Sequence, residues 1–323
     1  MAQRAALGPE REYARLPFVA APKLVPEPAR TPSEQRIHES LVSPPMTKRA
    51  LANPTILVFD SGLGGLTVYR EIARARPDAR YVYAADDAFF PYNAMDERRL
   101  IARALDLMER LITEHRPDLV VIACNTASTI VLPSLRAQLS VPFVGTVPAI
   151  KPACAASRSK RVSVLGTEAT VKREYTKALI REFAGDCQVT LVGSARLAAL
   201  AEAALAGNEV EDAEISSEIA PCFIDDGGAR TDTIVLACTH YPLLADRLTR
   251  LAPWQVNFID PAPAIARRVV DLIGPAVNGQ APATPEVMFS SGRTPPSALW
   301  TWLNGSARPA PSPRGAARLH PPR

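Results

Sequence analysis

The stretches Asp118-Leu-Val-Val-Ile-Ala-Cys124-Asn125-Thr126 and Asp232-Thr-Ile-Val-Leu-Ala-Cys238-Thr239-His240 share one pattern. Each has an acid, a short apolar run rich in β-branched residues, and a cysteine followed by polar residues. Such runs are typical of buried strands in parallel sheets. In open α/β sheets ligands bind beyond the carboxyl ends of the strands, which is where both cysteines fall. The two stretches therefore predict an α/β fold in which two thiols face one site.

The sequence around these stretches alternates expected strands and helices. We expect strands at 55–59, 81–84 and 143–145, and helices at 66–74, 98–114 and from 128 onward. From residue 161 the order begins again: Phe59-Asp60-Ser61 aligns with Leu165-Gly166-Thr167 at an offset of 106 residues, and Cys124 with Cys238 at an offset of 114. The pattern predicts two similar, pseudo-symmetric α/β domains with mainly parallel sheets and the active site in the cleft between them.

The domain limits follow from this order and from the composition of the two ends. We expect residues 53–147 plus 258–300 to form the first domain and residues 148–257 the second. Of the 31 prolines, 8 fall in residues 1–50 and 5 in residues 304–323, where no helix or strand periodicity survives. Residues 1–52 are therefore predicted to be a disordered Pro/Arg-rich extension and residues 301–323 a disordered tail. Met46 leaves a later start of the chain open.

The distribution of charge argues against a nucleic-acid-binding core. The net charge is +4, but residues 1–50 carry 8 basic and 5 acidic side chains and residues 304–323 carry 4 Arg and no acid. The remaining chain is therefore mildly acidic, so we expect no nucleic-acid binding by the core.

Five cysteines without a CxxC pair, and no secretory signal, predict free thiols in a reducing cytoplasm. No apolar stretch approaches the ~18 uncharged residues of a membrane span, so no membrane association is expected. Cys154, Cys187 and Cys222 have no setting like that of the other two cysteines and are interpreted as structural.

The common state of a free cysteine is a small buried apolar side chain, and for Cys124 or Cys238 alone that interpretation would prevail. Both follow matched strands and precede polar residues, which favours acid/base chemistry by the pair. Asp60, at the start of a Gly-rich loop, and His240, two residues after Cys238, are the expected partners; their structural alternatives are a capping Asp and a buried His bonded to backbone. The loop lacks the spacing of a nucleotide-binding loop.

Six motifs, in order, give the chain a resemblance to a known family: Asp60-Ser61-Gly62, Pro91-Tyr92, Cys124-Asn125-Thr126-Ala127, Val147-Pro148-Ala149, Gly166-Thr167 and Cys238-Thr239-His240. Over residues 54–290 the chain resembles glutamate racemase, within the aspartate/glutamate racemase superfamily. The resemblance implies an isomerase that interconverts L- and D-glutamate without cofactor or metal and supplies D-glutamate for peptidoglycan, and hence for cell-wall biogenesis and cell shape. It also implies that Cys124 takes the proton from D-glutamate and Cys238 from L-glutamate.

The resemblance assigns the site residue by residue. Catalytic roles are implied for Cys124, Cys238, Asp60, His240 and Glu202, and substrate-binding roles for Asp60, Ser61, Tyr92, Asn93, Asn125, Thr126, Thr167, Thr239 and His240. Glu202 follows Ser194 by eight residues, where the family commonly has Cys at the first position; a solvated helix charge is the equal alternative for this Glu.

Two departures from the family leave other functions open. Asn93 replaces a usual Gly after Pro-Tyr, and Asp86-Asp87-Ala88-Phe89 replaces a usual Asp-Thr-Ala-Arg, so that a base is lost and an acid gained beside an anion site. The alternatives are an aspartate racemase or related enzyme such as an arylmalonate-type decarboxylase, and a weakened racemase that binds a partner such as DNA gyrase. Beyond the substrate, a homodimer and an effector are left open.

Overall fold

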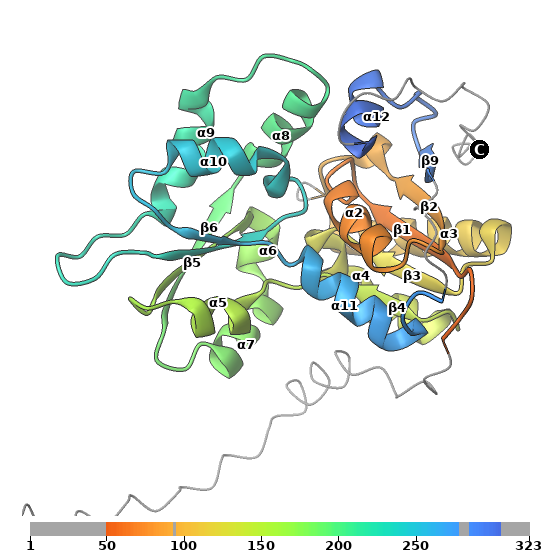
Figure 1. Cartoon of the computed structure of the whole chain (residues 1–323), viewed down its shortest axis with the longest axis horizontal. Coiled ribbons are helices and arrows are strands. Elements are labelled where there is room, and N and C mark those ends of the chain that lie inside the picture. Colours follow the sequence, from red (N-terminus) through yellow and green to blue (C-terminus); the bar gives the residue numbers. More distant parts are fainter. Residues whose placement is uncertain (1–49, 93–94, 278–283, 305–323) are drawn as a thin grey trace, which may run out of the picture.

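The structure is a computed structural model that describes residues 50–92, 95–277 and 284–304. It consists of two α/β domains that lie side by side (Figure 1). The sheet of the first domain has the strand order β4-β3-β1-β2-β9, and all its pairings are parallel. Its strands are β1 (Thr55–Asp60), β2 (Arg80–Ala85), β3 (Leu119–Ile122), β4 (Phe143–Gly145) and β9 (Glu286–Phe289).

The second sheet repeats this arrangement. Its order is β6-β5-β7-β8, again with parallel pairings throughout. Its strands are β5 (Arg161–Thr167), β6 (Gln188–Ser194), β7 (Thr233–Ala237) and β8 (Asn257–Ile259). Read as β8-β7-β5-β6, it matches β4-β3-β1-β2, with β9 added at the edge of the first sheet. The predicted pair of similar parallel α/β domains is confirmed.

Helices cover both faces of each sheet. In the first domain, one face packs against α2 (Leu66–Ala75), α11 (Ala262–Ile273) and α12 (Ser297–Asn304), and the other against α3 (Glu97–His115) and α4 (Asn125–Gln138). In the second, α8 (Leu197–Leu205), α9 (Asp212–Ile219) and α10 (Ala245–Leu251) cover one face, and α5 (Ile150–Ala156) and α7 (Glu174–Phe183) the other. Because both faces are covered, the central strands are continuously apolar, as the sequence pattern indicated.

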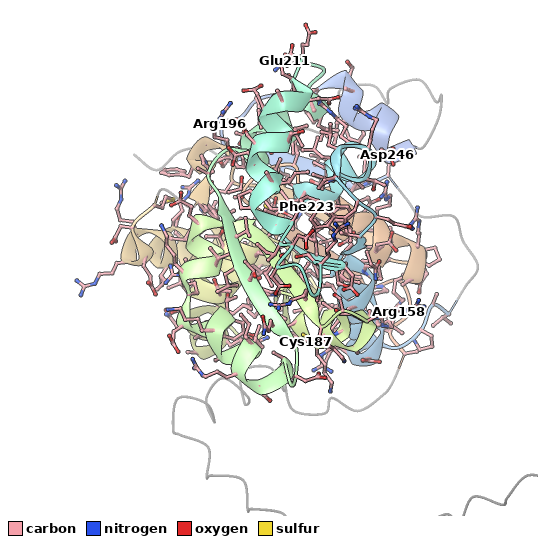
Figure 2. All side chains as sticks on the ribbon, turned by 90° about the vertical axis from the view of Figure 1, so that its left-hand side faces the viewer. Arg158, Cys187, Arg196, Glu211, Phe223 and Asp246 are labelled. Atoms are coloured by element: carbon pink, nitrogen blue, oxygen red, sulfur yellow. The ribbon has the colours of Figure 1, made fainter. Side chains whose placement is uncertain are left out.

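Short helical segments follow three of the strands: η1 (Asp87–Phe89) after β2, α6 (Glu168–Lys172) after β5 and η4 (Tyr241–Leu244) after β7. A further short segment, η3 (Ala220–Cys222), follows α9. Figure 2 views the second domain from its outer side, with Arg158 and Cys187 toward one end and Glu211 toward the other. Within the described ranges no helix is long and apolar enough to cross a membrane.

Several predicted boundaries differ from the structure. The expected division at 257/258 falls inside β8, because Asn257–Ile259 pairs with β7. Helix α4 begins at Asn125, not Ser128, because the Cys124 side chain caps it. Residues 301–304, predicted to be disordered, complete α12, whose Leu299 is buried in the core; residues 305–323 lie outside the described residues. Of the predicted extension, residues 1–49 also lie outside them.

A buried arginine holds the start of the described chain in place through hydrogen bonds. Arg76 is fully buried, and its guanidinium donates to both carboxylate oxygens of Asp78 at 2.9 Å. It also donates to the carbonyl oxygens of Leu51 (2.6 Å), Ile273 (3.2 Å) and Gly274 (2.9 Å). A guanidinium suits this place because its five N–H donors can satisfy several buried acceptors at once. Residues 50–52 are therefore ordered, contrary to the prediction.

We expect Arg76→Met to lower the free energy of unfolding by about 3–5 kcal/mol, because it removes the charge partner of the buried Asp78 carboxylate and the guanidinium donor to the Leu51 and Gly274 carbonyls. Urea unfolding followed by circular dichroism measures this. The matched control is Arg74→Met, which removes an exposed arginine paired with Glu71 on the same helix and should cost less than about 1 kcal/mol. Equal losses of stability in the two variants would contradict the conclusion that the buried Arg76 holds the start of the described chain in place.

Candidate active site

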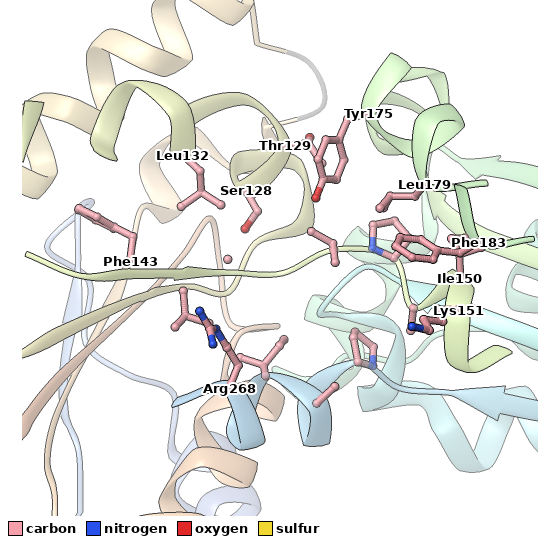
Figure 3. A pocket seen from close by; sticks show the side chains of 18 of the residues that line it. Ser128, Thr129, Leu132, Phe143, Ile150, Lys151, Tyr175, Leu179, Phe183 and Arg268 are labelled. Atoms are coloured by element: carbon pink, nitrogen blue, oxygen red, sulfur yellow. The ribbon is translucent and has the colours of Figure 1, made fainter. Parts of the chain in front are cut away.

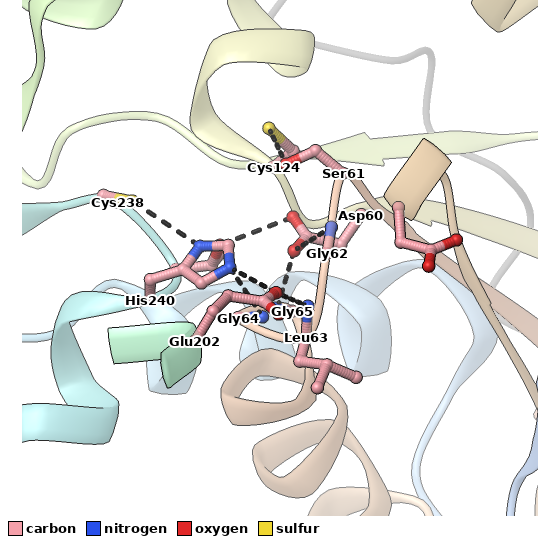
Figure 4. A network of polar contacts seen from close by, with 12 residues as sticks. Asp60, Ser61, Gly62, Leu63, Gly64, Gly65, Cys124, Glu202, Cys238 and His240 are labelled. Atoms are coloured by element: carbon pink, nitrogen blue, oxygen red, sulfur yellow. Dashed lines mark hydrogen bonds and ion pairs between the residues drawn. The ribbon is translucent and has the colours of Figure 1, made fainter. Parts of the chain in front are cut away.

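Both matched cysteines face a small cleft between the two domains (Figure 4). Its volume is about 20 Å³, room for roughly one water molecule. The residues that line it come from strand ends and helix starts of both domains: Ser61, Phe90, Pro91, Tyr92, Cys124, Asn125, Thr126, Thr167, Ala198, Cys238, Thr239 and His240. Nine of these were predicted as site residues from the sequence; Phe90, Pro91 and Ala198 were not among the candidates.

A larger cavity, about 680 Å³, lies where the chain crosses between the domains (Figure 3). Its walls come from α4, α5, α7 and α11, and include Val147, Pro148 and Pro261 at the two crossings. It is lined by Arg136, Lys151 and Arg268 but by no cysteine, histidine or carboxylate. Although it is much larger, the groups able to move protons gather in the small cleft.

Cys124 is a buried thiol at the start of helix α4. Its sulfur accepts from the N–H of Ala127 at 3.4 Å and lies 3.6 Å from the hydroxyl of Ser61. Burial, and then the charge of Asp60, raise the pKa of Cys124 to about 12 despite these two donors. Cys124 is therefore held in the protonated form, as a proton donor, while the same two donors are placed to stabilise its thiolate.

Cys238 is placed differently, beside a histidine. Its sulfur lies 3.8 Å from Nδ1 of His240, and Nε2 of that ring lies 3.0 Å from Oε1 of Glu202. Burial disfavours the charged ring, but the hydrogen bonds to Cys238 and Glu202 outweigh it and raise the pKa of His240 to about 10. His240 is thus an imidazolium at neutral pH, and its positive ring lies beside the Cys238 sulfur.

The ring nitrogen Nε2 of His240 has two neighbours that make opposite demands. Glu202 requires a donor, whereas the N–H of Gly64, 3.2 Å away, requires an acceptor. The carboxylate favours the ring with a proton on Nε2, because a charge-assisted hydrogen bond from an imidazolium to Glu202 is stronger than the neutral hydrogen bond from the Gly64 N–H. If the ring loses the Nε2 proton, Gly64 supplies the donor. Each protonation state therefore has a partner.

Glu202 is held from the opposite domain. Its Oε1 accepts from the N–H of Leu63 at 2.5 Å, and its side chain is 16% exposed. Burial alone would favour the neutral acid, but the hydrogen bond and charge of His240, the Leu63 N–H and Arg293 together hold the pKa of Glu202 below its usual value. The structure places Glu202 behind His240 and not on the outer face of a helix, the alternative that the sequence left open.

Asp60 organises the loop that approaches this pair. Its Oδ2 accepts from the N–H groups of Gly62 (3.3 Å) and Gly65 (3.0 Å), and its Oδ1 from the hydroxyl of Thr239 (3.4 Å). Burial raises the pKa of Asp60, against the charge of His240 and the two backbone donors. Asp60 therefore holds the Gly-rich loop through backbone donors and also contacts Thr239, the residue that follows Cys238.

The glycines of this loop permit close contact between the domains. A side chain at Gly62 would overlap Glu202, and one at Gly64 would overlap both His240 and Thr239. A Cβ at Gly65 would crowd Asp60 and Tyr83. The glycine spacing excludes a nucleotide-binding loop, and the packing of these glycines against the second domain is a long-range contact that no local sequence pattern indicates.

Polar groups for a small ligand surround the thiols. Asn125 is 2% exposed, and within the described part of the chain neither Oδ1 nor Nδ2 of its side chain has a hydrogen-bond partner. The Thr126 hydroxyl lies 3.1 Å from that of Thr167, which lies 2.9 Å from that of Thr170. Buried polar atoms rarely lack partners, so Asn125 is available for a ligand. Thr170 was not predicted; its place three residues after Thr167, on the first turn of α6, is the signal that was available.

The departures near Tyr92 are compensated by neighbouring residues. The Tyr92 hydroxyl donates to Asp86 at 2.7 Å, and Arg103 pairs with the same carboxylate at 2.7 Å. The Arg103 guanidinium lies 4.5 Å above the Phe89 ring, so a cation remains where the family's arginine is missing. The acid gained at Asp87 is not left unpaired beside an anion site, because it pairs with Arg293 at 2.6 Å. Asn93 lies outside the described residues.

The other three cysteines lie away from the cleft. Cys154 and Cys222 are buried, and burial is the main cause that raises the pKa of each to about 12. Cys187 donates a weak bond to the carbonyl of Cys154 at 3.5 Å. Their positions are those of packing residues.

Comparisons with known proteins agree with this geometry. A family model described as Asp/Glu/Hydantoin racemase matches residues 56–269. The chain is 56% identical over 225 residues to glutamate racemase from Brucella anthropi, across 69% of this chain and 81% of the relative, and 57% identical over 219 residues to that from Brucella ovis, across 68% and 79%. A crystal structure of Escherichia coli glutamate racemase, in complex with L-glutamate and the activator UDP-MurNAc-ala, is similar at a TM-score of 0.70 and 38% identity, over 78% of this chain and 94% of that one.

We expect the His240 ring to titrate near pH 10 in a proton NMR titration, because its imidazolium is bonded to Cys238 and Glu202. A pKa raised from 6.5 means that the charged ring stabilises the fold fully below pH 6.5 and ceases to do so as the pH rises through about 10. Glu202→Gln should lower the pKa of the ring. Glu218→Gln, which removes an acceptor from Ser194 in the same domain, should leave it in place. A ring that titrates near 6.5 in the unaltered protein would refute the ion-pair assignment.

Proposed function

The chain belongs to the Asp/Glu/Hydantoin racemase family and is an amino-acid racemase that acts on glutamate, and we propose that Cys124 and Cys238 exchange the Cα proton from opposite faces of the substrate. The observation that carries this proposal is the pair of thiols that end equivalent strands β3 and β7 and line one cleft. Inversion at Cα requires a base on one face and an acid on the other, and such a pair provides both without a cofactor.

From L-glutamate, the Cys238 thiolate removes the Cα proton while the His240 imidazolium balances its charge. The Cys124 thiol then delivers a proton to the opposite face. This direction matches the charges of the site as it stands, because Cys124 is held protonated and His240 is held charged. Glu202 fixes the ring through Nε2, so that Nδ1 stays directed at the sulfur.

From D-glutamate the roles reverse. Cys124 now serves as the thiolate, stabilised by the Ala127 N–H and the Ser61 hydroxyl, and Cys238 serves as the acid. Asp60 lies close enough to act on the Cys124 side, since its charge is among the causes that raise the pKa of that thiol. A negative charge at this place strengthens Cys124 as a base once the proton has left.

The polar groups of the cleft would hold the substrate. The first N–H groups of helix α4 lack partners within the helix, and the Asn125 side chain beside them is unpaired among the described residues. These donors, with Ser61, Thr126, Thr167 and Thr239, suit the two carboxylates of a small amino acid such as glutamate. Tyr92 lines the same cleft, and we propose that Asn93 contributes its N–H. Because the cleft has a volume of only about 20 Å³, the two domains must separate for glutamate to bind.

We propose, as the resemblance implies, that the reaction takes place in the cytoplasm and supplies D-glutamate for peptidoglycan. An aspartate racemase or a decarboxylase of the same superfamily would use the same cleft, and the relatives favour glutamate. A purely binding role, for example toward DNA gyrase, is disfavoured by the different and complete support of each thiol.

The test follows the Cα proton by NMR in deuterated water and the chirality by circular dichroism. The unaltered protein should exchange and racemise either glutamate enantiomer, with slower reaction on aspartate. Cys124→Ala and Cys238→Ala should each abolish racemisation. Because one base remains in each, Cys124→Ala should still exchange the proton of L-glutamate, and Cys238→Ala that of D-glutamate.

Cys222→Ala, a buried cysteine outside the cleft, is the matched control and should retain full racemisation. Substantial racemisation by either cleft variant would refute the two-thiol mechanism. Exchange of the same enantiomer by both variants would refute the assignment of faces.

A further inference from the structure

Arg293 connects the two domains at the edge of the catalytic network. Its Nε lies 2.6 Å from Oδ2 of Asp87, in the first domain, and its Nη2 lies 3.8 Å from Oε2 of Glu202, in the second. No motif in the sequence indicated this residue. Its two carboxylate partners are separated by 115 positions along the chain, so only the fold brings them together.

The contact with Glu202 completes the support of that carboxylate. Its Oε1 already receives the Leu63 N–H and the His240 ring, and its Oε2 faces Arg293. Without a partner on Oε2, the carboxylate could rotate about its terminal bond and draw Oε1 away from His240. An arginine at this oxygen opposes that rotation, because it attracts the second oxygen from the other side.

Arg293 is itself anchored. Asp87 is only 7% exposed and accepts from the N–H and hydroxyl of Ser291, at 3.0 and 2.6 Å. The guanidinium of Arg293 also lies 4.5 Å from the centre of the Phe289 ring, at the end of β9. Asp87 and the Phe289 ring therefore both contact the guanidinium, although the arginine side chain is 41% exposed.

We propose that Arg293, held by Asp87, is a positioning residue for the Cys238 face of the reaction: it fixes Glu202, which orients His240 toward the Cys238 sulfur. The inference rests on the proposed two-thiol function and adds a residue to it. It also gives a purpose to Asp87, the acid by which this chain departs from the family pattern.

A merely structural ion pair would have a different signature. At 41% exposure of the arginine the pair contributes little to folding, so removing it should barely change stability. Its effect on catalysis can be larger, because a small misplacement of a catalytic group lowers the rate strongly. Only a positioning role predicts an effect confined to one face.

The experiment compares four variants: Arg293→Met, Arg293→Lys, Asp87→Asn and Arg80→Met. The last is the matched control, because Arg80 pairs with Glu286 across the same strands β2 and β9, but at their amino ends, away from the cleft. We expect Arg293→Met to lower kcat/KM roughly tenfold. The loss must be equal for both enantiomers, because their equilibrium constant is fixed by symmetry. Arg293→Lys and Asp87→Asn should lose less, and Arg80→Met nothing.

Proton exchange in single-thiol backgrounds separates the two faces. Added to Cys124→Ala, Arg293→Met should slow exchange of L-glutamate by roughly tenfold. Added to Cys238→Ala, it should leave exchange of D-glutamate unchanged. Equal slowing on both faces, or slowing on neither, would overturn the proposal. The proposed function would be unaffected by this failure, since it depends on the cysteine variants alone.

The pH profile of kcat/KM is a second readout that does not depend on exchange in the single-thiol variants. The charged groups around His240 are Glu202, Asp60 and Cys238, with Arg293 beyond Glu202. Loosening Glu202 weakens its bond to the imidazolium, so Arg293→Met should move the basic limb of the profile to lower pH. Arg293→Lys should restore part of the shift. A profile identical to that of the unaltered protein would also overturn the proposal.

Discussion

The close approach of the Gly62–Gly65 loop to His240 and Glu202 is the constraint on which the site depends. The loop belongs to the first domain and the two side chains to the second, and backbone N–H groups of Leu63 and Gly64 point at them from 2.5 and 3.2 Å. No side chain could stand at Gly62 or Gly64 without displacing these groups. Asp60 shapes the loop from within, through the N–H groups of Gly62 and Gly65. The backbone of one domain thus holds the two side chains that the proposed mechanism assigns to the Cys238 thiol of the other.

The two halves share a strand order, yet they support their thiols by different means. Cys124 relies on a helix N-terminus and a serine, within reach of the Asp60 charge, whereas Cys238 relies on a histidine and a glutamate. A symmetric ancestor would give two equal thiols, and equal thiols would be in the same protonation state. Two-base catalysis requires one to be charged and the other neutral at each step. The difference between the halves therefore matters as much as their likeness.

The sequence was sufficient for the features that depend on local pattern. β-Branched runs located the central strands, and the repeated Cys-ended stretches located both thiols and the cleft between matched domains. Features that depend on distant pairings were beyond it. Leu51 is ordered by Arg76 and Ile273, α12 is ordered by the core that buries Leu299, and Asp87 is neutralised by a residue 206 positions later. Amino-acid composition predicted disorder at the chain ends because it reflects local propensity only and not contacts with residues far away in the sequence.

The position of β9 near the end of the chain affects the order in which the two domains can fold during translation. This strand pairs with β2, about 200 residues earlier, whereas the strands of the second sheet are contiguous in the chain. A ribosome releases residues in order, so the second sheet can close while the first still lacks its edge. Until translation passes Phe289, β2 has an uncovered edge, the kind of surface on which nascent chains associate with one another. The domain that begins first is the one that finishes last.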